Sequence, residues 1–196
     1  MMTHIVKSME YNQTTDDLRH KIAIILHRTW PTICPMPNKE EIPEAHEKEL
    51  NVRSFYICID EKLISYTGVI RKTITHNGQI FNIAGLSCVT TDRDYRGQGI
   101  GLQTVATATQ WIREQSDIDF GIFTCEPSLA DFYKRAGAWS VVPDITLIGS
   151  KDEKALSSEH IRVVVLMRLF SEKSMENESV LRNTTINLDL PVGQFL

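Results

Sequence analysis

Apolar residues recur at helical spacing in two long stretches of the chain, and this pattern predicts its two main helices. The apolar face of the first helix is formed by Leu18, Ile22, Ile25 and Leu26. Thr14 or Thr15 caps its start, and Trp30-Pro31 ends it. The apolar face of the second helix is formed by Leu102, Val105, Ala106, Thr109 and Ile112. A shorter helix is predicted from Pro127, which suits a first turn, to Gly137, which suits a left-handed cap.

Runs of alternating or continuous apolar residues predict the strands. They cover Ile5–Met9, Ser54–Asp60, Leu63–Ile74, Gln79–Thr91, Asp119–Cys125 and Ile161–Phe170. The second and third strands form a hairpin that turns at Asp60-Glu61-Lys62, and an exposed His76 begins the turn His76-Asn77-Gly78 into the fourth. Four of the seven prolines fall in Pro31–Pro43, which predicts a loop there, followed by a short acidic helix. This order of elements predicts a mixed α/β (α+β) fold with a central, mostly antiparallel mixed sheet flanked by helices.

The length of 196 residues suits one domain. A single domain is predicted over residues 1–170, followed by a C-terminal extension over residues 171–196. Within this polar extension, Thr185–Leu190 has a strand-like pattern. The extension therefore either packs on the domain or is mobile.

The end of the fourth predicted strand leads into a glycine-rich turn and then a helix. Three glycines within five positions, Gly97, Gly99 and Gly101, let backbone amides gather in a turn that side chains would block. Because the turn lies at a helix N-terminus, its exposed N–H groups and the helix dipole favour an anion. No lysine follows Gly101, and Leu102 occupies the last glycine position of a dinucleotide fingerprint. Both nucleotide motifs therefore lack a residue that their mechanisms require.

The segment Arg96-Gly97-Gln98-Gly99-Ile100-Gly101, with its preceding strand, resembles the coenzyme A pyrophosphate loop of the GCN5-related N-acetyltransferase (GNAT) superfamily. A second segment, Tyr133-Lys134-Arg135-Ala136-Gly137, resembles that superfamily's other recurring motif. The specific part of the match covers residues 85–139, and a looser part covers residues 53–170. This resemblance implies the GNAT fold and acetyl-CoA as co-substrate.

The resemblance also implies roles for individual residues. Val89, Thr90 and Thr91 would hold the pantetheine and thioester of the donor. Arg96, Gly97, Gln98, Gly99, Ile100 and Gly101 would hold its pyrophosphate. Tyr133 would be the general acid that protonates the departing thiolate. The alternative for Tyr133 is a purely structural core aromatic, but Phe132 is the better core candidate on this helix.

The general base is the least defined part of the predicted site. Several aminoglycoside 2′-N-acetyltransferases, which this chain resembles in size and layout, have a glutamate where Ser87 stands. Their acidic-tryptophan ending is also absent, since the chain ends Pro191-Val192-Gly193-Gln194-Phe195-Leu196. Both differences argue against an aminoglycoside acceptor. A water held by Ser87 or by strand carbonyls is one candidate base, and Glu126 is another.

Composition and charge narrow the function classes. The chain is 42% hydrophobic and 23% charged, as is ordinary for a globular protein, and no apolar run approaches the roughly 18 residues of a membrane span. The net charge of −4 argues against nucleic acid as a partner and suits a cationic acceptor. Met1–Tyr11 has neither a basic region nor an apolar core, so no signal peptide is expected and the predicted location is cytoplasmic.

The four cysteines do not form a metal-binding or disulfide pattern. Cys34, Cys58, Cys88 and Cys125 are scattered without a CxxC pair, and three of them fall in predicted strands. They are expected to be small buried residues in a reducing compartment. No metal is expected, and no histidine adjacent in sequence supports a cysteine acyl-enzyme.

The sequence therefore predicts an acetyl-CoA-dependent N-acetyltransferase that acts directly on the primary amine of a small, cationic acceptor. An acyltransferase with a longer acyl donor, as in rhizobial N-acyltransferases, is one alternative. A non-catalytic CoA-binding or sensing module is another. The stretch His27–Leu50 is expected to select the acceptor, although its glutamates also fit a solvated surface. A homodimer is one candidate assembly.

Overall fold

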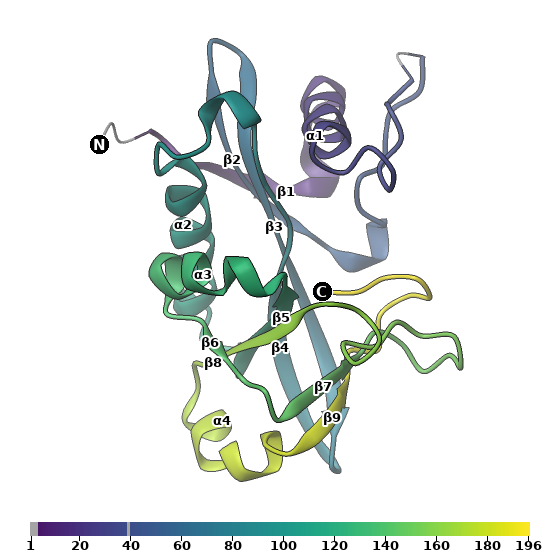
Figure 1. Ribbon diagram of the computed structural model, residues 1–196, viewed down its shortest axis with the longest axis vertical. Helices are drawn as coiled ribbons and strands as arrows, with labels where there is room; N and C mark the ends of the chain where they lie inside the picture. The colour runs from purple at the N-terminus through teal and green to yellow at the C-terminus, as the bar shows by residue number, and fades with distance from the viewer. Residues whose placement is uncertain (1–3, 39) are drawn as a thin grey trace. The chain divides into compact units, whose positions relative to one another are not determined.

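The computed structural model describes residues 4–38 and 40–196, and Figure 1 labels its helices and strands. The helices are α1 (Asp16–Thr29), α2 (Ile100–Glu114), α3 (Ala130–Gly137) and α4 (Glu172–Glu176). The strands are β1 (Lys7–Glu10), β2 (Arg53–Ile59), β3 (Lys62–His76), β4 (Gln79–Thr91), β5 (Phe120–Cys125), β6 (Ser140–Val141), β7 (Ile145–Ile148), β8 (Val164–Leu169) and β9 (Thr184–Asn187). Across these ranges, every helix is too short or too polar to cross a bilayer.

The predicted fold class is confirmed: the chain is mixed α/β with a large, mostly antiparallel sheet. Seven strands of the described chain are hydrogen bonded in the order β1-β2-β3-β4-β5-β8-β6, and β4 and β5 run parallel. The chain forms two compact units. The first contains residues up to Ile70 and Leu86–Ala108, and the second contains Arg71–Gly85 and Thr109–Leu196.

In the first unit, β1 and β2 pair antiparallel, with Lys7 opposite Tyr56 and Glu10 opposite Arg53. The strand predicted at Ile5–Met9 therefore lies slightly later in the chain. Residues 1–3, which begin the segment expected to lack a signal peptide, lie outside the described residues. Asp60 and Glu61 both have positive φ, so the hairpin between β2 and β3 closes through a two-residue turn that matches the sheet's twist.

The first helix matches its prediction closely. Thr15 is its N-cap, and the Thr15 hydroxyl accepts a hydrogen bond from the Leu18 amide. The acidic helix predicted after Pro43 is wrong, because that stretch holds only a one-turn 3-10 segment, Lys48–Leu50. Asn51 follows in the left-handed conformation, which ends the turn after Leu50.

In the second unit, β8 pairs antiparallel with β5, and β7 pairs parallel with β9. The last strand was predicted from Ile161, but β8 begins at Val164 because residues 159–162 form turns. Residues 171–196 contain α4, a 3-10 turn and β9. The carbonyl oxygen of Leu196 accepts hydrogen bonds from the backbone N–H (3.0 Å) and hydroxyl (2.5 Å) of Thr124. The domain boundary at residue 170 remains a prediction.

The short helix α3 ends differently from the prediction. The left-handed residue is Ala138, with φ 53°, and Gly137 is the last helical residue. A Cβ on Gly137 would lie 2.6 Å from the hydroxyl of Thr109 and 2.6 Å from the indole nitrogen of Trp139. Close packing, rather than backbone conformation, therefore requires glycine at position 137. Trp139 is fully buried, as expected of a packing residue.

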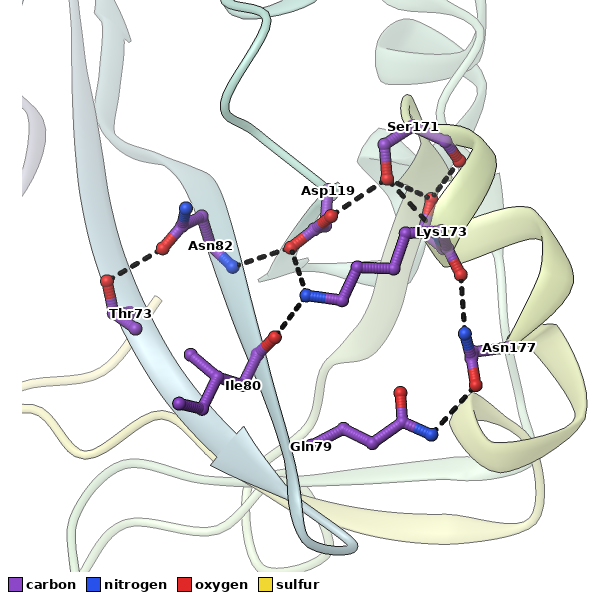
Figure 2. A network of polar contacts seen from close by, with 9 residues as sticks. Thr73, Gln79, Ile80, Asn82, Asp119, Ser171, Lys173 and Asn177 are labelled. Carbon is purple, nitrogen blue, oxygen red and sulfur yellow. Dashed lines mark hydrogen bonds and ion pairs between the residues drawn. The ribbon is translucent and has the colours of Figure 1, made fainter.

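A polar network around Asp119 connects β4 with the segment at the start of α4 (Figure 2). The Asp119 carboxylate accepts hydrogen bonds from the amide of Asn82 at 2.9 Å and the hydroxyl of Ser171 at 2.9 Å. Lys173 donates to the same carboxylate and to the carbonyl of Ile80. These bonds tie the start of β4 to the segment that begins α4.

The turn between β3 and β4 contains a second correction. His76 was predicted to be exposed but is 6% exposed, and its Nε2 lies 3.1 Å from the carbonyl oxygen of Val180. The sequence around His76-Asn77-Gly78 identified the turn correctly. It gave no sign of Val180, which lies 104 residues further along the chain.

Candidate active site

The last residues of β4 form the first part of the predicted donor site. Val89 and Thr91 are half-buried, and Thr90 is buried. The hydroxyls of Thr90 and Thr29 lie 2.5 Å apart, which fixes the end of α1 against this strand. The structure therefore places residues 89–91 on a rigid element, as a binding site requires.

Strand β4 continues to Thr91, but its backbone is irregular just before residues 89–91. Cys88 has φ 52°, a left-handed conformation that is rare outside glycine. Its neighbour Ser87 is half-buried, and the Ser87 hydroxyl donates to the Cys88 sulfur at 3.6 Å. The irregularity alters the direction of backbone groups next to Val89. The role of Ser87 in holding a water remains a prediction.

The glycine-rich loop connects β4 to α2 as predicted. The Asp92 amide donates to the carbonyl of Ile64 at 2.8 Å, which anchors the start of the loop on β3. Gly97 and Gly99 have φ values of 76° and 82°, so both use the freedom of glycine. The helix then begins at Ile100, which is buried with Ile57 and Ile64. The loop and helix start therefore lie where the sequence predicts them, and anion binding by the first N–H groups of α2 remains a prediction.

Arg96 lies on the surface at the start of this loop. Its Nε donates to the carbonyl oxygen of Thr91 at 3.0 Å, so the side chain folds back toward the end of β4. Gln98 is also exposed, and its amide donates to the carbonyl of Asp94 at 3.3 Å. The structure thus brings Val89–Thr91 and Arg96–Gly101 together in one continuous segment of the first unit.

Two cations neutralise the acidic residues beside the loop. Asp92 is buried, and its carboxylate lies 2.6 Å from Arg28 and 3.1 Å from Lys62. Both cations also lie 3.8 Å from Asp94. Burial would raise the pKa of Asp92, but hydrogen bonds from Lys62 and the Asp94 amide, with the Arg28 charge, hold it below its ordinary value. These pairs reduce the repulsion that a bound diphosphate would meet.

The stretch expected to select the acceptor is irregular and partly anchored. His27 points its Nδ1 at the carbonyl oxygen of Cys34, 2.8 Å away, so this nitrogen carries the proton. The glutamates of the stretch His27–Leu50 are exposed. Glu44 lies within 4 Å of both Arg19 and Lys48, an arrangement that suits a solvated surface.

A buried polar cluster in this stretch was missed by the sequence analysis. His46 is 5% exposed, its Nε2 lies 2.8 Å from the Tyr66 hydroxyl, and that hydroxyl lies 3.0 Å from Ser54 Oγ. Burial lowers the pKa of His46 to about 4, so the imidazole is neutral at pH 7. The ring of Tyr11 packs edge-on against it. The only sequence signal was a histidine beside an alanine in a charged segment, which does not predict burial.

Tyr133 belongs to the second unit. It is 6% exposed and packs against Phe123 and Phe132, with ring centroids 5.0 Å away in each case. Phe132 is only half-buried, so the expectation that Phe132 would be the core residue of this helix is wrong. Burial, followed by the nearby Cys125, raises the pKa of Tyr133, which keeps the phenol protonated at neutral pH. Glu126, the other base candidate, is exposed.

The four thiols are free and poorly suited to nucleophilic catalysis. Burial is the main cause that raises the pKa of each of them, and it raises that of Cys125 to about 11 with the help of Glu126. A thiol must lose its proton to attack a thioester. Within the described ranges, no group of three or more His, Cys, Asp or Glu side chains is arranged to hold a metal ion.

A known protein family shares the sequence pattern of this chain. The family model of the acetyltransferase (GNAT) domain matches residues 18–142 of the sequence. These residues include the end of β4, the glycine-rich loop and Tyr133. The chain belongs to the GNAT acetyltransferase family. A search of curated protein sequences finds no match.

Solved structures share the GNAT fold. The YhbS N-acetyltransferase of Escherichia coli in complex with CoA has a TM-score of 0.60 and 14% identity, over 94% of this chain and 88% of that one. An acyl-CoA N-acyltransferase from Pseudomonas aeruginosa has a TM-score of 0.57 and 13% identity, over 85% and 99%. A GNAT-family acetyltransferase from Streptococcus pneumoniae has a TM-score of 0.54 and 12% identity, over 84% and 99%.

Family membership establishes the general activity. The chain is an acyltransferase of the GNAT type, and the predicted resemblance is confirmed over residues 18–142. The activity of this family supports acyl-CoA-dependent N-acyl transfer. The roles of individual residues and the identities of donor and acceptor remain predictions.

Proposed function

We propose that this GNAT protein transfers an acetyl group from acetyl-CoA directly to the primary amine of a small, cationic molecule. The observation that carries the proposal is the loop Arg96–Gly101, in which two positive-φ glycines lead into the N-terminus of α2. This geometry suits a diphosphate, because backbone N–H groups and the helix dipole both favour a bound anion. Val89–Thr91 would hold the pantetheine and thioester.

The reaction requires two proton movements. An amine with a pKa near 10.4 is unprotonated in only about one molecule in a few thousand at neutral pH, so a base must first remove a proton. The amine nitrogen then bonds to the thioester carbon, and the carbon–sulfur bond breaks. Tyr133 would donate its proton to the sulfur, and the proton that the nitrogen loses after the bond forms would restore the phenol, giving an amide and free CoA. A water held by Ser87, or Glu126, would take the amine proton.

Direct transfer is supported by the state of the cysteines. Burial raises the pKa of all four thiols, so little thiolate is present at neutral pH to form an acyl-enzyme. The cationic acceptor is suggested by the net charge of −4. Assembly as a homodimer is proposed on the sequence alone, and sedimentation equilibrium would test it.

Donor binding is the first experiment. Saturating acetyl-CoA, at 100 times its Kd, should stabilise the protein by about 2.7 kcal/mol and raise Tm by roughly 5–10 °C. The double variant Arg96→Ala, Gly99→Trp should lose this shift. Arg93→Ala removes an exposed arginine just before the loop and serves as the matched control. A folded wild-type protein that shows no shift with acetyl-CoA or CoA would refute the proposed donor site.

Turnover assays separate the catalytic proposal from its alternatives. With a panel of polyamines and aminosugars, acetyl-CoA should support turnover better than longer acyl-CoAs or acyl-carrier protein. A preference for longer donors would identify the chain as a different acyltransferase. Tyr133→Phe should lower kcat by about 10² to 10⁴-fold while retaining CoA affinity. CoA binding without turnover on any amine would favour a sensing module.

A further inference from the structure

A chain of buried hydroxyl groups lies beneath the proposed donor site in the first unit. Ser65, on β3, is 1% exposed, and Thr104, on α2, is fully buried. The two hydroxyl oxygens lie 2.8 Å apart. Ser65 Oγ also lies 3.2 Å from the carbonyl oxygen of Thr90 and 3.3 Å from the hydroxyl of Thr91. One small side chain therefore contacts both the helix and the end of β4.

The number of hydroxyl protons determines which group donates and which accepts in this series of hydrogen bonds. Each hydroxyl has one proton to donate, and a carbonyl oxygen can only accept. Thr104 can donate to Ser65 at 2.8 Å or to the carbonyl of Ile100 at 3.1 Å. With Thr104 donating to Ser65, the Ser65 proton is free to satisfy the Thr90 carbonyl. This arrangement uses the shorter bond from Thr104.

Separate hydrogen bonds connect the same strand end to the loop and to α1. The carbonyl of Thr91 accepts a hydrogen bond from Arg96 Nε at 3.0 Å. Thr90 is linked on its other side to Thr29 of α1. Ser65 and Thr104 thus act on residues of the proposed donor site without being part of it, through contacts that are nearly closed to solvent.

We propose that Ser65 and Thr104 are positioning residues for the acyl-CoA donor. They fix the end of β4 relative to the first turn of α2, so that the strand and the loop are both set before the donor binds. This inference rests on the proposed function, because it assumes that residues 89–101 hold the donor. Loss of the Ser65 hydroxyl leaves the Thr90 carbonyl without this donor, and loss of the Thr104 hydroxyl leaves the buried Ser65 oxygen without the donor that orients it. The strand end would then shift to recover a partner.

The test compares three variants of α2 by isothermal titration with CoA. Thr104→Val keeps the side-chain volume and removes the hydroxyl, and it should raise the CoA Kd about five- to tenfold. Thr104→Ser keeps the hydroxyl and should bind within about twofold of wild type. Thr107→Val is the matched control, since Thr107 also bonds to the carbonyl four residues earlier but is exposed. It should bind CoA as wild type does.

Kinetics with the best amine give a second readout. Thr104→Val should raise the KM for acetyl-CoA and leave the KM for the amine unchanged. Wild-type affinity in Thr104→Val, or failure of Thr104→Ser to restore binding, would overturn the inference while leaving the proposed function intact. If wild type itself did not bind CoA, the proposed function would fail first. If Thr104→Val does not fold, Ser65→Ala tests the same series of hydrogen bonds. Ser65→Thr is then the variant that retains the hydroxyl.

Discussion

The Nε2 atom of His46 lies 2.8 Å from the hydroxyl oxygen of Tyr66, and both side chains are almost completely buried. Ser54 lies 3.0 Å from the same hydroxyl, and Tyr11 packs against the imidazole. The histidine must therefore fold in its neutral form. Its position ties the irregular segment before β2 to the middle of β3.

The free energy of unfolding is expected to decrease as the pH is lowered, because of this histidine. Burial lowers the pKa of His46 from about 6.5 to about 4, so between these values the unfolded chain binds a proton that the folded chain does not. The contribution is complete above pH 6.5 and is lost progressively as the pH falls toward 4. The free energy of unfolding should drop by about 1.4 kcal/mol per pH unit in this range. Urea denaturation at several pH values measures it.

Two variants test the assignment of this slope to His46. His46→Gln removes the titrating group and should flatten the pH dependence between 4 and 6.5, at the cost of lower stability at pH 7. His160→Gln removes a histidine from an exposed turn and is the control. An unchanged slope in His46→Gln would contradict the prediction.

The ion pairs of Asp92 should matter more than those of its neighbour Asp94. Asp92→Asn leaves Arg28 and Lys62 facing an uncharged group in a buried position, and the free energy of unfolding should fall by about 2 kcal/mol. Asp94→Asn changes an exposed carboxylate with two pairs at 3.8 Å, and the expected loss is about 0–0.5 kcal/mol. Chemical denaturation at pH 7 compares them. Equal losses in both variants would refute a special role for Asp92.

Asp119 organises the polar network of Figure 2. Asp119→Ala removes the acceptor for Asn82, Ser171 and Lys173 together. The expected loss is about 2–3 kcal/mol, or roughly 5–10 °C in Tm. Asp117→Ala, two residues earlier and exposed, is the matched control. A Tm for Asp119→Ala within 2 °C of the control would show that the network contributes little.

Two neighbouring substitutions at the end of α3 should change the free energy of unfolding in opposite directions. Ala138→Gly should stabilise the protein by about 1 kcal/mol, because Ala138 holds a positive φ that glycine adopts without strain. Gly137→Ala should destabilise it by more than about 1 kcal/mol, because the new Cβ would collide with Thr109 and Trp139. Thermal denaturation of both variants measures the difference. A stabilising Gly137→Ala would contradict the close packing of Gly137 against Thr109 and Trp139.

Most of the secondary structure could be predicted because it depends on local pattern. The apolar face of α1, the hairpin at Asp60-Glu61 and the loop before α2 are all determined by residues that are close in sequence. The burial of His76 and the packing at Gly137 depend on Val180 and Thr109, which lie far away in the chain. Sequence periodicity contains no information about such partners.

The glycine-rich loop could also be predicted from residues close in sequence, since Gly97 and Gly99 occupy the positions that need positive φ values. Ser65 and Thr104 were missed because a buried serine or threonine within an apolar run looks like a weak core residue. Their chemical role appears only when β3 and α2 are brought together. The one available signal was a small hydroxyl residue at a predicted core position on each element.

Each compact unit is built from two stretches of chain that the other unit separates in sequence. The chain must therefore leave the first unit after Ile70 and return to it at Leu86 before that unit is complete. No single cleavage point would release either unit as a continuous fragment. Contacts between residues as distant as Thr124 and Leu196 add a high contact order, which favours slow folding. During synthesis, the first unit can finish folding only after Ala108 has left the ribosome, and the second unit must wait for the segment up to Leu196.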